Sequence, residues 1–427
     1  MLKIALRNVF RNRRRSLLSL SLIALGGAIL FLSGAYFDET IYQLRWSSAH
    51  QYGHLQIAAA GYWGNGTGAK PLISKAMLGQ IAEILGRESE VERFTTQLSL
   101  SGLIGTERKS VIFRAIGVEP GKGIGEFPLE EGEELTLGDK AQALIGTGMA
   151  ENLGVELGDY LTVMTTTIDG AYNAGALQVK GIFSWWQSEV NNQLAIVPLF
   201  FAQQMLNTDA VEKVLVELKS LEATARVAAR LLERFKAEEL PLEVKRWDEL
   251  SVFYRQVRGY YGAIYSFITA AIFTLVFFSI LEMMTMSFFE RMREIGTLRA
   301  IGAGRPEVFL IFLSEGLILG FFGALLGIGL GWGLGELINS AGLSYVPPSS
   351  TMAVPLKVRL VLGNMIAPFF TALFSALVST LYPALRAART GVVEALRYVY
   401  NNDHRDENGF PARPRRARPG PPRLSPD

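Results

Sequence analysis

The chain contains no cysteine, only three histidines, and few charged residues for its length. Without cysteine it has no disulfide scaffold, no thiolate nucleophile and no zinc-ribbon site. Charged residues make up 19% of the 427 residues, whereas a soluble protein carries about 25%. The shortage is concentrated in four apolar runs, which indicates an integral membrane protein with a large water-soluble part.

Motifs for nucleotide and acyl chemistry are also missing. No segment matches the phosphate-binding loop G-x-x-x-x-G-K-[ST] or the nucleophile elbow G-x-S-x-G. His50 and His54 have the i, i+4 spacing of a metal pair, but Gly53 weakens a helix there and no acidic third ligand is nearby. We interpret them as a surface pair, and we expect no catalytic, cofactor-binding or metal-binding residue in this chain.

Four apolar runs are long enough to cross a hydrocarbon core of about 30 Å. The first, residues 16–37, has no charge and follows six basic residues. A secretory signal peptide has the same pattern, but the length of the run and the later spans favour a retained anchor. The other three runs are residues 260–289, 308–337 and 360–385.

Charge is distributed unevenly between the segments that separate these runs. Residues 38–258 carry 21 Lys and Arg against 29 Asp and Glu, a net charge of −8, so the rest of the chain carries +10. Basic residues flank the first run, separate the second from the third, and follow the fourth. The positive-inside rule then predicts four crossings with both termini inside and residues 38–258 outside. Nothing in this pattern indicates binding of nucleic acid.

The exported segment 38–258 is predicted to be an α+β domain. Stretches rich in Val, Ile, Thr and Phe predict strands at 110–118, 160–168, 176–183 and 212–219, and residues 221–237 form an amphipathic helical pattern. The predicted fold is therefore a membrane protein with four transmembrane α-helices and a large α+β domain between helices 1 and 2.

Four segments follow from this prediction. Residues 1–37 are an inner N-terminal segment with helix 1, and residues 38–258 are the exported domain. Residues 259–400 hold helices 2–4 with an inner segment at 290–305. Residues 401–427 are rich in Pro and Arg and are predicted to be a disordered inner tail.

The third apolar run carries small residues at intervals of three or four, a pattern that lets helix backbones approach closely. This packing occurs either within one subunit or at a subunit interface, and the pattern does not distinguish the two. The glycines concerned are Gly316, Gly320, Gly323, Gly327, Gly331 and Gly335.

Two carboxylates, Glu282 and Glu315, lie in apolar helices, where a charge is costly and a functional role is the default hypothesis. For Glu315 we favour an ion pair with an inner arginine such as Arg299. For Glu282 three roles remain open: a polar contact to the third span, a subunit contact, or a proton-sensitive group.

Aromatic residues gather where the first two spans meet the exported domain. They line a cavity for acyl chains or form an interfacial belt, and both readings stay open. They are Phe37, Tyr42, Trp46, Phe253, Tyr260 and Tyr261. Trp185 and Trp186 are either an exposed docking surface in the exported domain or a core pair.

Residues 290–303, ERMREIGTLRAIGA, closely resemble the signature E-R-x-R-E-I-G-x-L-R-A-x-G-A of FtsX-like ABC permeases. Residues 382–397 resemble the family's C-terminal ending, although Val392 or Val393 stands where the family usually has proline. The exported domain is similar to the macrolide-exporter-type periplasmic domain, as at residues 117–118 and 149–154. Glu282 is a departure, because the family more often has Asn or another neutral residue there.

The resemblance implies a complex in the bacterial inner membrane, with residues 38–258 in the periplasm and both termini in the cytoplasm. Two permease chains, identical or paralogous, would work with a separate ABC ATPase homodimer that binds ATP and Mg²⁺. The motif would be the coupling element, with charged contacts and an apolar side formed by Ile295, Leu298 and Ile301. The coupling residues are Glu290, Arg291, Arg293, Glu294, Ile295, Gly296, Leu298, Arg299 and Gly302.

Three functions fit this family. The first is extraction of a lipoprotein or another amphiphile from the outer leaflet, with membrane lipid and a periplasmic carrier as partners. The second is efflux of a small amphiphile or peptide through an adaptor and an outer-membrane duct. The third is transmission of force to a periplasmic cell-wall hydrolase without transport. We favour the first.

Overall fold

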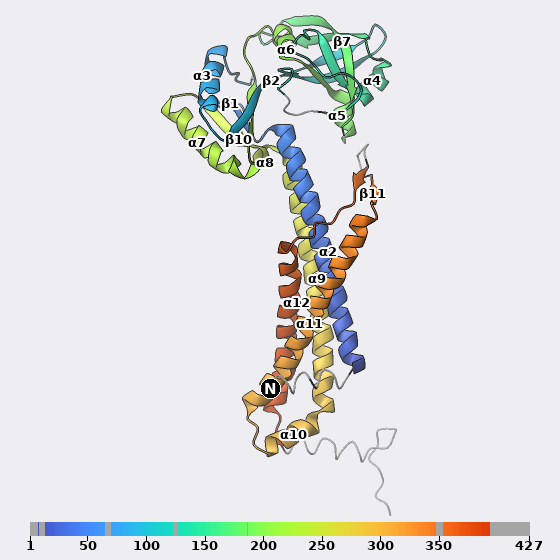
Figure 1. Cartoon of the computed structure of the whole chain (residues 1–427). Coiled ribbons are helices and arrows are strands. Elements are labelled where there is room, and N and C mark those ends of the chain that lie inside the picture. Colours follow the sequence, from blue (N-terminus) through green and yellow to red (C-terminus); the bar gives the residue numbers. More distant parts are fainter. Residues whose placement is uncertain are drawn as a thin grey trace, which may run out of the picture. The chain divides into compact units, whose positions relative to one another are not determined.

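The computed structural model describes Arg7 and residues 13–64, 70–122, 127–185, 187–346 and 353–392 (Figure 1). The chain divides into two compact units. The bundle unit comprises residues 1–36, 263–337 and 358–427, and the α+β unit comprises residues 37–262 and 338–357. The tail predicted at 401–427 lies outside the described residues.

Among the described residues, four helices are long and apolar enough to cross a membrane. They are α2 (Arg13–Tyr52), α9 (Val252–Glu290), α11 (Arg305–Ser340) and α12 (Gly363–Arg389). The predicted fold class, four such helices with an α+β domain between the first and the second, is confirmed. Helices α2 and α9 extend furthest beyond their apolar runs, because α2 continues to Tyr52 and α9 begins at Val252. A short helix, α10 (Met292–Ala300), separates α9 from α11.

Several glycines of the pattern in α11 face other helices of the same chain. A Cβ atom at Gly320 would collide with Ala376 of α12, and one at Gly327 would lie 2.7 Å from the Ala24 carbonyl oxygen of α2. Gly327 also faces Gly27, so two helix backbones meet without side chains between them. The glycine pattern therefore serves packing within the subunit at these positions.

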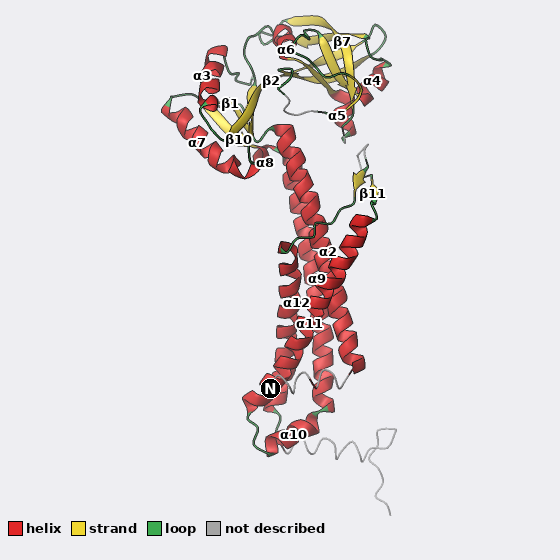
Figure 2. Cartoon of the chain, in the orientation of Figure 1, coloured by secondary structure: helices red, strands yellow, loops and turns green. Residues whose placement is uncertain are grey.

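A mixed sheet runs through the α+β unit in the order β10-β1-β9-β2-β3-β8-β5-β7-β4, and β6 pairs with both β2 and β7 (Figure 2). Strands β2, β3, β8, β5, β7 and β6 thus form a closed ring. The strands are β1 (Leu55–Ala59), β2 (Val91–Gly105), β3 (Ser110–Val118), β4 (Leu129–Gly132), β5 (Gln142–Gly146), β6 (Tyr160–Thr166), β7 (Tyr172–Phe183), β8 (Leu194–Pro198), β9 (Lys213–Leu218) and β10 (Leu242–Arg246). The pair β11 (Ser344–Tyr345) and β12 (Val354–Pro355) is separate.

Strand β2 links two hydrophobic cores. Its first half pairs with β9 and its second half with β3 and β6. The second half contributes Leu98 and Leu100 to the core inside the ring. On the other side of the unit, helices α3 (Lys75–Gly86) and α7 (Thr224–Ala237) pack on β1, β9 and β10, with Ile81, Val227 and Phe235 buried between them. Because successive side chains of a strand point to opposite faces, one sheet contributes side chains to both cores.

The remaining helices of this unit are short. They are α4 (Thr147–Leu153), α5 (Ser188–Gln193), α6 (Leu199–Leu206), the 3₁₀ helix η1 (Leu221–Ala223) and α8 (Trp247–Leu250).

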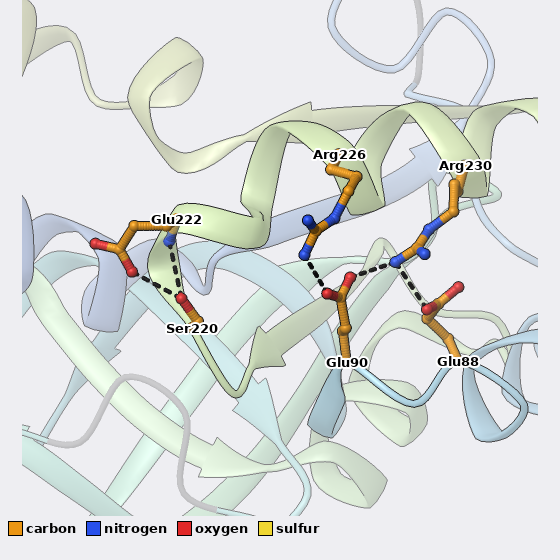
Figure 3. A network of polar contacts seen from close by, with 6 residues as sticks. All are labelled: Glu88, Glu90, Ser220, Glu222, Arg226 and Arg230. Carbon is orange, nitrogen blue, oxygen red and sulfur yellow. Dashed lines mark hydrogen bonds and ion pairs between the residues drawn. The ribbon is translucent and has the colours of Figure 1, made fainter.

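An ion-pair network attaches α7 to the start of β2 (Figure 3). Glu90 accepts hydrogen bonds from Arg226 and Arg230, and Arg230 also pairs with Glu88 at 3.0 Å. Glu88 is buried, and the two arginines lie one helical turn apart, so both reach the same carboxylate. The network therefore holds the helix on the sheet.

The expectation of a surface histidine pair is wrong for His54. Helix α2 ends at Tyr52, so His50 and His54 do not share a helix face. His54 is buried, and its Nδ1 accepts a hydrogen bond from the backbone N–H of Leu218 at 2.9 Å. Desolvation by burial lowers the pKa of His54, with Glu217 opposing this shift. His54 is thus a neutral structural residue between α2 and β9.

Candidate functional site

The candidate site is α10 together with the helix ends that flank it, all within the bundle unit. Helix α9 ends at Glu290, and Arg291 leaves helical geometry, with φ −107° and ψ 14°, before α10 begins. After α10, Gly302 has φ +110°, a conformation that favours glycine, and α11 begins at Arg305. These two breaks allow a nine-residue helix to lie between two long ones.

One side of α10 is packed into the bundle. Met292, Ile295 and Gly296 are buried, and Met292 and Ile295 belong to the same apolar cluster as Phe288 and Phe312. This placement corrects part of the expected coupling surface. Ile295 is 4% exposed and contributes to the chain's own core rather than to an exposed apolar side.

Arg291 connects α10 to α11. Its Nη1 donates to Glu315 Oε1 at 2.8 Å and to Oε2 at 3.1 Å, and its Nε donates to Glu294 at 3.2 Å. The guanidinium lies 5.7 Å from the centre of the Phe312 ring. The Glu315 side chain is only 5% exposed, so its charge needs this partner. Glu315 therefore pairs with Arg291 and not with Arg299, the example expected from the sequence.

Arg299 connects the other end of α10 to the end of α12. Its Nη1 donates to the Thr390 carbonyl oxygen at 2.5 Å and lies 3.5 Å from that of Ala388. A cation at the last carbonyls of a helix satisfies acceptors that have no partner within the helix. Arg386 was not among the expected site residues, yet its guanidinium lies 5.8 Å from the Phe288 ring and 5.3 Å from the Phe289 ring. The only sequence signal for it is its place in the basic stretch after the fourth span.

The opposite side of α10 is exposed. It carries Arg293, Glu294 and Leu298, and Ile301 beyond the helix is 81% exposed. Glu290, at the end of α9, is exposed as well. The tertiary structure thus divides the motif: Arg291, Met292, Ile295 and Arg299 hold α10 to its own bundle, whereas Glu290, Arg293, Glu294, Leu298 and Ile301 are exposed.

Glu282 differs from Glu315. It is exposed on α9, in a stripe with Phe278 and Met286, whereas the neighbouring Met284 is fully buried. The carboxylate therefore points away from the bundle core of its own chain.

The six interfacial aromatic residues all belong to the α+β unit. Phe37 stacks on Tyr261 with ring centres 4.8 Å apart, and Trp46 stacks on His50 at 3.9 Å. Four of the six are exposed, namely Tyr42, Trp46, Phe253 and Tyr260. They thus form an exposed aromatic surface on the ends of α2 and α9.

Trp185 is half-buried, and Trp186 lies outside the described residues. The Trp185 ring meets Phe127 edge-on at 4.9 Å, and its backbone N–H and carbonyl both bond to the Asn191 side chain. The structure places Trp185 in a packed corner beside α5.

Two family models match the chain. The model of the MacB-like periplasmic core domain matches residues 16–234, and that of the FtsX-like permease C-terminal domain matches residues 266–392, which include α10.

Individual relatives agree with these matches. Over 64% of its length the chain is 26% identical to the lipoprotein-releasing system transmembrane protein LolC of Neisseria meningitidis, of which 72% is covered. It is 27% identical over 52% of its length to the macrolide export ATP-binding/permease protein MacB of Hyphomonas neptunium, of which 33% is covered. Among solved structures, the periplasmic region of MacB from Actinobacillus actinomycetemcomitans covers 46% of this chain and 89% of its own, with 14% identity and a TM-score of 0.34.

Proposed function

The chain is an ABC transporter permease of the LolC, LolE and MacB type, and from this premise we propose that it couples ATP hydrolysis in a separate ATPase to extraction of a lipoprotein or another amphiphile from the outer leaflet of the bacterial inner membrane. In this proposal the chain has no catalytic residue, and ATP and Mg²⁺ bind to an ATPase homodimer. A second permease copy, identical or paralogous, completes the complex.

The observation that carries the proposal is the division of α10 into two sides. Its buried side and the two arginine contacts serve the bundle, whereas Arg293, Leu298 and Ile301 are exposed and can contact another molecule. That side presents Arg293 and Glu294 beside the apolar Leu298 and Ile301, a combination suited to a groove on a protein partner.

Force on α10 has defined paths into the chain. Arg291 links it to Glu315 of α11, and Arg299 links it to the end of α12. Helices α2 and α9 each contribute residues to both units without a break in the helix. Closure of the ATPase dimer would move α10, and the helices would carry that movement as a rigid-body change.

The choice of cargo rests on similarity and on exposed aromatic residues. LolC of Neisseria meningitidis, which the chain resembles over 64% of its length, is a lipoprotein-releasing protein. The exposed aromatic surface on the ends of α2 and α9 offers contacts for acyl chains at the membrane boundary.

A charge-reversal experiment tests the coupling step. In Arg293→Glu/Glu294→Arg, the ATPase is expected to be lost when the tagged chain is purified gently from native membranes. Glu83→Arg/Arg87→Glu is the matched control, because this exposed ion pair joins the last turn of α3 to its C-cap residue in the α+β unit. Equal recovery of the ATPase with both variants would refute the assignment of α10.

Mass spectrometry of the wild-type chain, purified in the same gentle way from native membranes, tests which cargo is bound. An acylated protein bound together with the ATPase is the expected result. An adaptor protein without acylated cargo would favour efflux, and a bound cell-wall hydrolase would favour force transmission.

A further inference from the structure

The α+β unit contains a cavity of about 710 Å³ on the face of the sheet opposite α3 and α7. Alternate residues of β2, among them Thr95, Gln97 and Ser99, line it, whereas the intervening Leu98 and Leu100 fill the ring. The sheet therefore presents side chains to this cavity that neither core uses. A volume of this size suits a small-molecule ligand, for which pockets of about 300–1,000 Å³ are usual.

One half of the cavity is polar and lacks partners for two of its groups. Thr95 is 2% exposed, and its buried Oγ1 has no hydrogen-bond partner in the described part of the chain. Lys213 lies directly across the ladder from Gln97 and is half-buried, and no described carboxylate lies within the 4.0 Å of a salt bridge, although the charge of Glu212 acts on it from farther away. A buried hydroxyl and a desolvated ammonium without partners cost free energy, so both groups indicate a missing acceptor.

The nearby carboxylates already have partners of their own. Glu212 accepts hydrogen bonds from the Tyr62 hydroxyl and from the Ser99 backbone N–H. Glu119 pairs with Lys122 and accepts from Thr96, and Glu134 is the one exposed carboxylate among the described residues that line the cavity. Three further cations of the described chain also line the cavity, namely Lys70, Arg114 and Arg93, and Arg93 pairs with Glu217. Burial lowers the pKa of Lys213. The charge of Glu212 opposes this shift and the charge of Lys70 reinforces it, so an added anion would offset the free-energy cost of burying the ammonium group.

The other half of the cavity is apolar. Leu135, Leu144 and Ile196 are buried there, with Val118 and Phe127 packed against them. The cavity therefore has a cationic, hydrogen-bonding half and an apolar half on one continuous sheet face.

We propose that this cavity binds an amphiphile with a single anionic group, a carboxylate or a phosphate, whose anion contacts Thr95 and Lys213 and whose chain lies along Leu144 and Ile196. The proposal does not rest on the permease function, because the cavity lies within one unit and binding requires neither ATP nor the ATPase.

Direct titration tests it. The full chain in amphipol is titrated with the fluorescent fatty acid 11-dansylaminoundecanoate, which is expected to bind saturably. Lys213→Met is expected to weaken binding about tenfold, the scale of one charge-assisted hydrogen bond. Lys75→Met, which removes an exposed lysine of α3, is the control and should not change the affinity. Decanoate should displace the probe, and uncharged decanol should do so about tenfold less well.

A second pair of variants keeps the test decisive if Lys213→Met does not fold. Ile116→Glu places a carboxylate in the cavity and should abolish binding, whereas Ile112→Glu lies on the same strand at a 72% exposed position and should not. Equal affinity in the members of both pairs, or equal displacement by decanoate and decanol, would overturn the proposal.

Discussion

Arg291 and Glu315 form a buried ion pair between the break that precedes α10 and the third turn of α11, with Nη1 of Arg291 2.8 Å and 3.1 Å from the two carboxylate oxygens. Because Arg291 also contacts Glu294, one guanidinium joins an exposed residue of α10 to a buried residue of α11. The pair is thus a mechanical link between the proposed ATPase-binding surface and the helix bundle.

Removing one member of this pair should destabilise the bundle. Glu315→Ala leaves the Arg291 charge without its buried partner, for which we expect a loss of about 3–5 kcal/mol. The double variant Arg291→Met/Glu315→Leu should recover most of the loss, because apolar residues replace both charges. Thermal unfolding in detergent measures both effects, and equal instability of the single and double variants would contradict this explanation.

Loss of the Arg299 contact should separate ATPase binding from coupling. Arg299→Ala retains the exposed side of α10, so the ATPase should still co-purify. The rate of coupled ATP hydrolysis should fall about tenfold, within the range of coupling energies of ~0.5–2 kcal/mol per residue. Arg389→Ala, an exposed arginine in the last turn of α12, is the control. If the rate of ATP hydrolysis fell equally in Arg299→Ala and Arg389→Ala, the effect would come from the loss of a basic charge and not from the loss of the contact between α10 and α12.

Gly327 should not tolerate a side chain. A methyl group there would meet the Ala24 carbonyl oxygen and the Gly27 backbone of α2, so Gly327→Ala should cost about 1–3 kcal/mol. At Gly329, on the same helix, nothing lies within 4 Å of an added Cβ, and Gly329→Ala should be neutral or stabilising. Thermal unfolding of the two variants side by side checks this difference, which would vanish if α11 did not pack against α2 in this register.

His54 should make the α+β unit less stable in acid. Its pKa in the folded chain is lowered by burial, so the unfolded chain binds the proton more tightly and stability rises with pH. The contribution is present above the unfolded pKa of about 6.5 and is lost as pH falls through the folded value. The unfolding temperature should therefore drop more between pH 7.5 and 5.5 in the wild type than in His54→Gln.

The two carboxylates of the apolar helices, Glu282 and Glu315, should respond differently to neutralisation. Glu282 is exposed on its helix, so Glu282→Gln should change the stability of the isolated chain by less than about 0.5 kcal/mol. Glu315→Gln removes half of a buried ion pair and should be clearly destabilising. If Glu282→Gln destabilises the isolated chain as strongly as Glu315→Gln, the exposed position of Glu282 is incorrect.

Features that depend on neighbours along the chain were predictable. The four membrane helices follow from long apolar runs, and β3 was expected at the residues where it is found, because its Val, Ile and Phe content favours a strand. The position of α10 along the chain was also predictable, because a charged, glycine-containing motif separates two apolar runs there. The ends of the helices were less predictable, because packing in the α+β unit carries α2 and α9 beyond their apolar runs.

Pairings between distant residues were decided by the tertiary structure alone. Several inner arginines were available to Glu315, and only the break at Arg291 and the packing of Phe312 place one guanidinium against it. The cavity that contains Thr95 and Lys213 likewise depends on the register of β2 against β9, which joins residues more than a hundred positions apart. Hydropathy and local motifs determine which segments become helices, strands and turns, because those preferences act over a few residues. Which charges meet depends on how these elements pack, and that is a property of the whole fold.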